Sequence, residues 1–341
     1  MSVAAAVALD RKVAERRRFR RRLTLPAVAL LAFAATFLTL GYGGVKIDPW
    51  TAFQALLGDG LPQDVTVIRE YELPRILLAW LVGMGLAVAG AVIQGVIRNP
   101  LAAPDVIGIT QGAGLAASAA LVFLPGLDIY QLPLFAFLGG ILAFALVYVI
   151  AYTKGASPVR LALVGIAVAA LCESGIRFLL VKEQTAIGSA LVWLSGSLAG
   201  KDMDAVKQIA PWVLVLLPLT VLCVRRLDVL GLGDELAQGL GEPVERTRRW
   251  TLVLAVALAS ASVAAGGTIA FVGLLAPHMA RRLVGARHAL LLPTAAFLGA
   301  LLVLVADAVG RGAFAPLEIP AGLITAIIGA PYFLYLLMRT T

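Results

Sequence analysis

Histidine, cysteine and charged residues are all scarce in this chain of 341 residues. It has two histidines and two cysteines, and 14% of its residues are charged, about half of the roughly 25% found in soluble domains. Hydrophobic residues make up 60%. No soluble fold can bury so much apolar surface, and the same composition excludes a disordered chain, a collagen and a small disulfide scaffold. The chain is therefore predicted to be a polytopic membrane protein.

The few cysteines and histidines argue against a disulfide or a metal site. Cys172 and Cys223 both lie inside apolar stretches, where small buried residues are the expected interpretation. His278 and His288 form no H-E-x-x-H pattern and belong to no cluster of metal-ligand residues. No nucleophile–base pair is visible either. We therefore expect no metal ligands and no enzymatic activity in this chain.

Two segments look like nucleotide-binding motifs, and neither meets its requirements. Gly112-Ala-Gly114-Leu-Ala-Ala117 matches a relaxed dinucleotide fingerprint, but it lies at the entrance of an apolar span and not in a soluble βαβ unit. Small residues there favour close helix packing. Gly200-Lys201-Asp202 has no Ser or Thr after the lysine, as a P-loop requires. We expect no bound cofactor, and if the chain is an active transporter, its ATPase is a separate chain.

Apolar segments long enough to cross a bilayer need about 20 residues. We read ten such segments, with soft boundaries: 23–43, 76–97, 106–125, 133–152, 159–180, 209–224, 250–265, 268–284, 289–309 and 319–338. The predicted fold class is an all-α integral membrane protein with about ten transmembrane helices. We divide it into a basic N-terminal tail, 1–22, and a single transmembrane domain, 23–338.

Basic residues indicate the orientation of these spans. The tail carries eight Lys and Arg residues. With an even number of spans, 20 of the chain's 28 Lys and Arg residues fall in the tail and the inner segments. This bias places both termini in the cytoplasm. It also explains the net charge of +8 without a nucleic-acid partner. The tail resembles a twin-arginine signal, but nine further spans favour an uncleaved first helix.

Three connections between spans are predicted to carry structure of their own. The inner connection 225–249 is polar and punctuated by glycine, and it fits two short helices near 227–231 and 234–240. On the outer side, 44–75 could hold a short surface helix over 49–57. The second outer connection, 183–208, contains an apolar stretch too short to span, which predicts a partial or interfacial helix.

Charged residues within spans are costly and are functional candidates by default. Glu173 and Arg177 are four residues apart in the fifth span and share one helix face. They are either a pair that neutralises itself during insertion or a polar patch near a transport path. Asp307 and Glu318 lie near the outer ends of the last two spans, where each could cap a helix or line the outer rim.

The segment 94–105, QGVIRNPLAAPD, is the most unusual of the chain. Gln94, Asn99 and Asp105 stand between two apolar runs together with two prolines. Because Pro100 and Pro104 do not allow one continuous helix, and because a broken polar connection is tolerated only against protein or water, we predict a re-entrant turn near the inner mouth.

Three long motifs resemble one known family. Leu73-Pro74-Arg75 with AWLVGMGLAVAGAVIQGVIRNPLAAPDVIGITQGAG (79–114), GGTIAFVGLLAPHMARRLVG (266–285) and ADAVGR…LEIPAGLITAIIGAPYFLYLL (306–337) look like the signatures of the iron-siderophore and vitamin B12 ABC importer permeases. The resemblance covers roughly residues 25–338. The form RNPLAAPD followed by IGI favours the ferric citrate and ferric siderophore branch.

This resemblance implies a type II ABC importer permease with ten helices per subunit. It further implies a dimer with a second permease subunit, identical or different, around one central pathway in the bacterial cytoplasmic membrane. Two cytoplasmic ATP-binding subunits, which hold ATP and Mg, would power it. An external substrate-binding protein would deliver the cargo.

The resemblance also implies arginines that dock the binding protein on the outer rim. Arg75 matches the second arginine of the family's R-x-P-R, whereas the first is replaced by Glu72. Arg69, three residues earlier, could compensate, and Arg311 matches another docking arginine. Guanidinium groups suit this contact because they pair bidentately with carboxylates. The substitution at Glu72 leaves the number of docking pairs open.

The inner connection 225–249 resembles the coupling helices that fit a groove on the ATP-binding subunit. Glu235-Leu236-Ala237 followed by Gly241 is close to the importers' E-A-A-x-x-x-G pattern. Leucines would supply apolar contact and arginines a polar rim; an ordinary basic loop is the alternative. The residues assigned to this contact are Leu230, Asp234, Glu235, Leu236, Ala237, Leu240 and Gly241.

The turn before the fifth span narrows the pathway in relatives, and here it contains Ser157 and Pro158. It lacks the hydroxyl pair of the vitamin B12 importers, which implies a different cargo. The residues assigned to the pathway and its gate are Gln94, Asn99, Ser157, Pro158, Glu173 and Arg177.

The hypothesis from sequence is a permease subunit that imports an iron(III) chelate, ferric citrate or a siderophore complex. A permease for cobalamin, haem or molybdate is the first alternative. An ion-driven secondary transporter is the second, but it would need midplane acidic residues in matching halves. A membrane-embedded enzyme has no catalytic constellation to support it.

Overall fold

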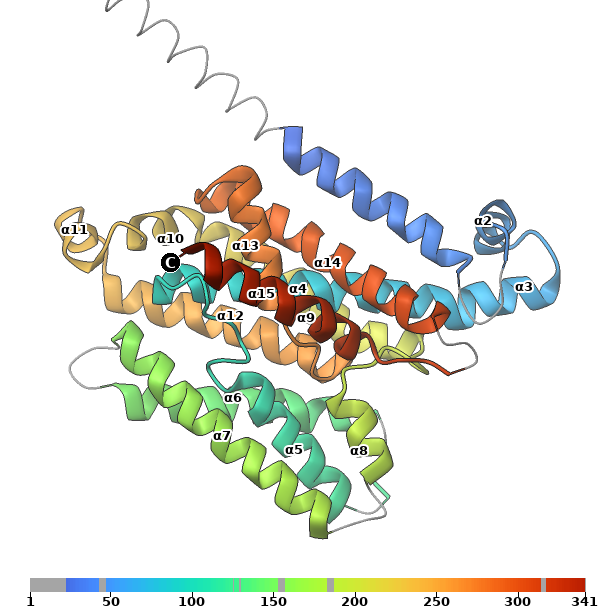
Figure 1. Ribbon diagram of the computed structural model, residues 1–341, viewed down its shortest axis with the longest axis horizontal. Coiled ribbons are helices and arrows are strands. Elements are labelled where there is room, and N and C mark those ends of the chain that lie inside the picture. Colours follow the sequence, from blue (N-terminus) through green and yellow to red (C-terminus); the bar gives the residue numbers. More distant parts are fainter. Residues whose placement is uncertain are drawn as a thin grey trace, which may run out of the picture.

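The structure is a computed structural model, and it describes residues 23–42, 47–124, 126–128, 130–152, 157–182, 187–313 and 317–340. The predicted N-terminal tail 1–22 lies outside these residues. The described part is built from helices (Figure 1).

The helices of the first half follow the predicted spans and surface segments. They are Leu23–Leu40, α2 (Pro49–Leu57), α3 (Pro62–Thr66), the π-helical segment η1 (Val67–Glu72), α4 (Leu73–Ile97), α5 (Ile109–Phe123), α6 (Leu132–Ala151) and α7 (Pro158–Lys182). The surface helix expected over 49–57 is confirmed by α2.

The second half contains both long helices and short connecting ones. They are α8 (Ile187–Leu194), α9 (Met203–Leu222), α10 (Val224–Leu230), α11 (Asp234–Gly239), α12 (Val244–Gly266), α13 (Val272–Val284), α14 (His288–Gly312) and α15 (Ala321–Thr340). The partial helix expected within 183–208 is α8, and the two short helices of the inner connection are α10 and α11.

A helix covers each of the ten predicted spans. Seven helices of the described chain are long and apolar enough to cross a membrane, and α5 and α15 contain shorter apolar helices. Helix α13 has 13 residues and carries Arg281 and Arg282 in its last turn. The largest difference is at the second span, where a continuous helical stretch begins at Pro62 and not at 76. Its first turns carry Asp64, Glu70 and Glu72, so hydropathy alone missed them.

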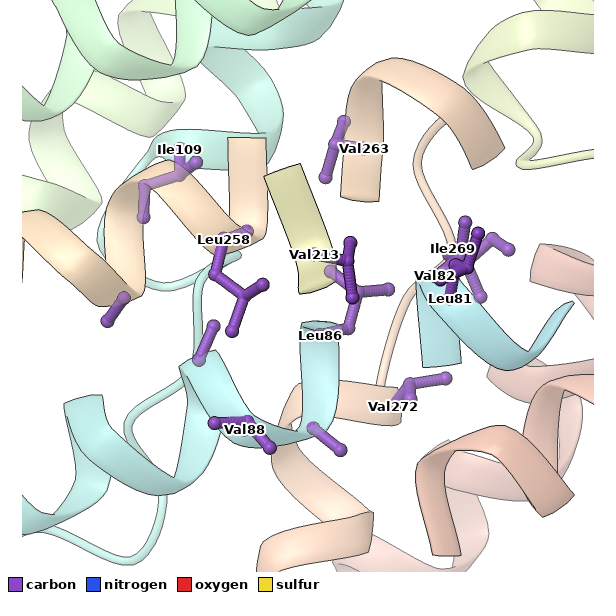
Figure 2. Packing of buried hydrophobic residues seen from close by; sticks show 14 of the residues in the cluster. Leu81, Val82, Leu86, Val88, Ile109, Val213, Leu258, Val263, Ile269 and Val272 are labelled. Carbon is purple, nitrogen blue, oxygen red and sulfur yellow. The ribbon is translucent and has the colours of Figure 1, made fainter. Parts of the chain in front are cut away.

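Helix α4 forms the centre of the bundle. Most of its residues are buried, and it packs against α14, α12, α13 and α9. Figure 2 shows Leu81, Val82 and Leu86 of α4 meeting branched residues of α9, α12 and the entry to α13. Because α4 has apolar neighbours on every side, its apolar residues do not form a single stripe.

Small residues let α4 and α14 approach closely. A Cβ atom added at Gly83 would lie 2.4 Å from the Gly299 carbonyl oxygen, and one added at Gly299 would lie 2.2 Å from the Gly83 oxygen. Gly112 similarly packs against Ala143 and Gly139 of α6, which agrees with the helix packing predicted for this segment. Such contacts are a general way to join helices in membranes.

Two breaks interrupt the long helices. Helix α4 ends at Ile97 with Arg98 as its C-cap residue, and a turn containing Pro100 and Pro104 leads to α5, which agrees with the predicted broken connection. A second break separates α12 from α13, where Phe271 has a φ of 66°. The Thr268 hydroxyl there donates to the Leu194 carbonyl, so this irregular segment contacts the end of α8, and irregular backbone at membrane depth is tolerated where it lies against protein.

Candidate functional site

The two ends of the bundle carry the polar residues that the sequence singled out. Helices α10 and α11 lie at one end, and α2 and α3 lie at the other (Figure 1). The positive-inside bias assigns the first end to the cytoplasm and the second to the outside. We describe the outer end first.

Five charged residues form one group near the outer end, which we call the outer ion cluster: Glu72, Arg75, Asp307, Arg311 and Glu318. The Nε of Arg75 donates to both carboxylate oxygens of Asp307, at 3.0 and 2.9 Å. Its Nη1 donates to Glu318 at 2.9 Å. Arg311 donates to Glu72, and its Nε lies 3.2 Å from Asp307.

The helices explain why these five residues meet. Asp307 and Arg311 lie four residues apart on α14 and therefore share a face. Glu72 and Arg75 lie where η1 joins α4, and the close packing of α4 on α14 brings the two pairs together. All except Glu318 are buried. Buried charges are tolerated only when they are paired and hydrogen-bonded, and here three carboxylates surround two guanidinium groups.

The position of Arg75 and Arg311 differs from the docking prediction. Both side chains are buried and paired with carboxylates of the same chain, so neither is displayed on the outer surface. Glu72, which replaces the first arginine of the family pattern, is the partner of Arg311. Arg69 is exposed, and its guanidinium donates to the Leu56 carbonyl at 2.9 and 3.1 Å. Of the three predicted docking residues, only Arg69 is accessible.

The inner end has its own charged network around α11. Asp234, the first residue of α11, accepts two hydrogen bonds of 2.9 Å from Arg248 of α12. It also lies 3.1 Å from Arg98 at the end of α4. Arg248 is buried and bonds Glu245 at 2.7 Å as well. Helix α11 is therefore tied to two long helices at once.

A second contact joins α10 to α14. Oδ1 of Asp228 on α10 accepts from the backbone N–H of His288 at 2.9 Å and lies 2.7 Å from its Nδ1. Asp228 thereby satisfies one of the free N–H groups at the start of α14. Helix α14 is thus fixed to α10 at its inner end and to the outer ion cluster at its outer end.

The surface of the inner end is apolar around α11. Leu236 and Leu240 are 63% and 67% exposed, and Leu232 beside them is also exposed. Leu230 and Ala237 are buried against the rest of the chain. The prediction that Leu230 supplies apolar contact to a partner is therefore wrong, because α10 packs its leucines inward. Gly241 has a φ of 82° and ends the α11 turn in a conformation that favours glycine.

Comparison with known proteins agrees with this arrangement. The model of the FecCD transport family matches residues 30–339. The chain belongs to the FecCD transport family. It is 47% identical to the Fe(3+)-citrate import system permease protein YfmE of Bacillus subtilis, over 96% of this chain and 98% of that protein. It is 45% identical to the Fe(3+) dicitrate transport system permease protein FecD of Escherichia coli, over 93% and 99%.

Two further relatives extend the comparison. The iron(3+)-hydroxamate import system permease protein FhuG of Bacillus subtilis is 43% identical over 93% of this chain and 97% of that protein. Among solved structures, an ABC transporter described as of metal-chelate type, in an inward-facing conformation, superposes with a TM-score of 0.83. It is 32% identical and covers 92% of this chain and 98% of that one. The FecCD chain is a multi-pass protein of the bacterial cytoplasmic membrane.

The predicted pathway residues of this FecCD chain do not all lie together. Glu173 and Arg177 of α7 form an exposed ion pair of 2.5 Å, on a face that the chain itself leaves open. Ser157 is exposed at the start of the same helix, beside the half-buried Pro158. Gln94, in contrast, is buried and donates to the Leu274 carbonyl, so it packs α4 against α13. Asn99 is exposed and caps its own turn through Leu101.

Sequence reasoning missed the residues that connect the helices. Arg98 pairs with Asp234, and Asp228 with His288, across long stretches of sequence that no local spacing predicts. Arg248 pairs with Asp234 at 14 positions, and only its i,i+3 pair with Glu245 could be predicted locally. Arg98 also has a φ of 56°, which is uncommon for a residue other than glycine and is visible only in the structure. In the described part of the chain, no group of three His, Cys, Asp or Glu residues could hold a metal ion.

Proposed function

We propose that this chain is the permease subunit of an ATP-driven importer for an iron(III) chelate, either ferric citrate or a siderophore complex. The observation that carries the proposal is the full-length similarity to permeases of Fe(3+)-citrate import systems in two bacteria. The similarity to an iron(3+)-hydroxamate permease is why the cargo is given as this class and not as one chelate.

We further propose the partners that such an importer needs. A second permease subunit would cover the exposed face of α7, where Glu173 and Arg177 would otherwise meet lipid at a cost of a few kcal/mol per charge. The pathway would then run along this face, with the turn at Ser157 and Pro158 as its inner gate. The chain itself would bind no cofactor, and ATP and Mg would belong to the partner ATPase.

The ATP-binding subunit would dock on α11 through Leu236 and Leu240. The ion pairs of Asp234 with Arg98 and Arg248 would transmit its movement to α4 and α12 as a rigid-body displacement. At the outer end, a binding protein would meet the exposed Arg69, whereas Arg75 and Arg311 would hold α4 and α14 together beneath it.

The proposal is tested by uptake of radiolabelled iron, supplied as ferric citrate and as several siderophore complexes, in cells with and without this gene. We expect loss of one chelate's uptake in the deletion strain and its return when the gene is restored on a plasmid. Unchanged uptake of every chelate would reject the iron assignment. Cobalamin and haem uptake in the same two strains would then be measured.

A further inference from the structure

A polar groove opens beside the coupling helices and is not explained by the proposed docking surface. It has a volume of about 620 Å³. Four parts of the chain line it: the end of α4, the turn after it, the end of α10, and the connection between α13 and α14. We call it the inner groove.

The inner groove is basic because two of its arginines have no acidic partner in the part of the chain that the structure describes. Arg281 and Arg287 both line it, and no carboxylate of the described residues lies within ion-pair distance of either. The buried Nε of Arg281 has no hydrogen-bond partner within the described chain. An unpaired buried donor is costly, so the Arg281 guanidinium has unused hydrogen-bonding capacity next to the groove.

The groove contains one acidic residue against the two arginines. Asp228 contributes a single carboxylate, and its Oδ1 accepts from the His288 backbone N–H and lies 2.7 Å from the ring Nδ1. Arg98, the third arginine of the lining, is paired with Asp234. The groove therefore presents two guanidinium groups without a carboxylate partner in the described ranges, and guanidinium suits bidentate pairing with carboxylates and phosphates.

The position of the groove indicates where the anion comes from. Gly231 and Leu232 line it and also connect α10 to α11, so the groove is continuous with the exposed leucines proposed to bind the ATP-binding subunit. We propose that the inner groove receives an acidic side chain, Asp or Glu, of that same subunit. This inference rests on the proposed function, since it presumes the ATPase partner.

The groove would give the ATP-binding subunit a second contact with the permease. The first contact, on α11, is apolar, and Asp234 links it to α4 and α12. The second contact is charged and lies on the α13–α14 connection, next to the Asp228–His288 contact that fixes the start of α14. One partner would then move both α4 and α14, the two helices that meet again in the outer ion cluster.

The test uses the permease co-expressed with the ATP-binding subunit of its own importer, and measures the dissociation constant of the purified subunits in detergent at two salt concentrations. Arg287 is exposed, so its variants should fold. We expect Arg287→Glu to weaken binding about tenfold and to reduce its salt dependence, because a like charge would face the partner's carboxylate. Arg287→Lys should stay close to wild type.

Arg282→Glu is the matched control, because Arg282 is exposed in the last turn of α13, just before the connection that holds Arg287, but does not line the groove. Equal binding by Arg287→Glu and Arg282→Glu would overturn the inference. A charge-reversal scan of the ATPase surface should also find one Asp or Glu whose change to Arg restores binding to Arg287→Glu. A scan with no such position would count against the groove as the acidic residue's site.

Two further arms separate this inference from its alternatives. Leu236→Asp tests the α11 surface alone: if it abolishes binding while Arg287→Glu does not, the groove inference fails and the docking proposal stands. If neither variant changes binding, the docking proposal itself fails. The amount of phosphatidylglycerol that co-purifies with the permease in detergent tests a lipid phosphate instead. Less bound phosphatidylglycerol in Arg287→Glu than in the wild type, with normal ATPase binding, would assign the groove to lipid and overturn the inference.

Discussion

Arg75 and Asp307 are separated by 232 positions in the sequence, yet the Arg75 Nε lies 3.0 and 2.9 Å from the two carboxylate oxygens. This pair joins the outer end of α4 to the outer end of α14. The pair also engages the Arg75 guanidinium, which the family resemblance assigned to docking of the substrate-binding protein. In this chain, the outer ion cluster first of all holds two central helices together.

Removing the central carboxylate of that cluster should destabilise the protein strongly. Asp307→Asn would leave Arg75 and Arg311 buried with too little negative charge, and breaking a buried ion pair from one side costs roughly 3–5 kcal/mol. We expect a clearly lower unfolding temperature in detergent and less protein in the membrane. Glu318→Gln is the control: Glu318 is partly exposed, so its loss should cost only about 0–1 kcal/mol. Equal effects of the two variants would contradict the central role of Asp307.

The α4–α14 contact should not tolerate a side chain at Gly299. The added Cβ would lie 2.2 Å from the Gly83 carbonyl oxygen, so one helix would have to move. Overpacking of this kind costs about 1–3 kcal/mol, and we expect Gly299→Ala to lower the unfolding temperature. Gly188→Ala on α8 is the matched control, because nothing lies within 4 Å of its added Cβ. If both variants unfold like the wild type, the close approach does not support the bundle.

The ion pair on α7 should matter for transport more than for stability. Arg177 and Glu173 are exposed in the single chain, and we propose that they line the pathway. We expect Glu173→Gln with Arg177→Met to reduce chelate uptake several-fold at normal membrane levels of the protein. The control is Asp204→Asn with Lys207→Met, an exposed pair of similar geometry at the outer start of α9. Wild-type uptake by the α7 variant would remove the pair from the pathway.

A hydrogen bond outside the spans should make part of the stability depend on pH. The Tyr130 hydroxyl donates to Asp202 at 2.6 Å, and this bond, followed by that from the Ala205 backbone, lowers the pKa of the Asp202 carboxyl. Since the folded pKa is below the unfolded value of about 3.9, the stabilisation is complete above that value. It is lost as the pH falls through the lowered folded pKa.

Tyr130→Phe should therefore unfold at a lower temperature than the wild type at pH 7, and this difference should shrink as the pH falls below about 4. The measurement is the unfolding temperature of both proteins across this pH range. Gln208→Ala is a suitable comparison, because Gln208 contacts the Tyr130 backbone carbonyl and carries no titratable group. A difference that stays constant with pH would show that Asp202 is not the acceptor that matters.

Several features of this protein were predictable from local pattern. The apolar runs predicted the spans, because a bilayer demands about 20 apolar residues in a row. The prolines at 100 and 104 predicted the break after α4, and the glycines and polar residues of 225–249 predicted α10 and α11. Each of these depends on a few neighbouring residues. The family motifs, which are also contiguous, led to the transporter class that the comparisons support.

The direction of individual side chains could not be predicted in the same way. Leu230 and Leu236 look equivalent in sequence, but one is buried and the other is 63% exposed. Arg69 and Arg75 both lie shortly before the predicted second span, yet only Arg69 is accessible. The difference arises because α4 packs against α14, and that packing decides which residues near their ends meet.

The sequence by itself determined the membrane-embedded all-helical class, the approximate spans and the family, since these follow from hydrophobic length and contiguous motifs. Only the tertiary structure decided that Glu72 and Arg75 meet Arg311 and Asp307, that Asp228 caps α14, and that two arginines of the inner groove have no carboxylate partner among the described residues. The physical reason is that a charge is stabilised by whatever lies a few ångströms away. In a bundle, those neighbours come from other helices, more than 200 residues distant for the outer ion cluster.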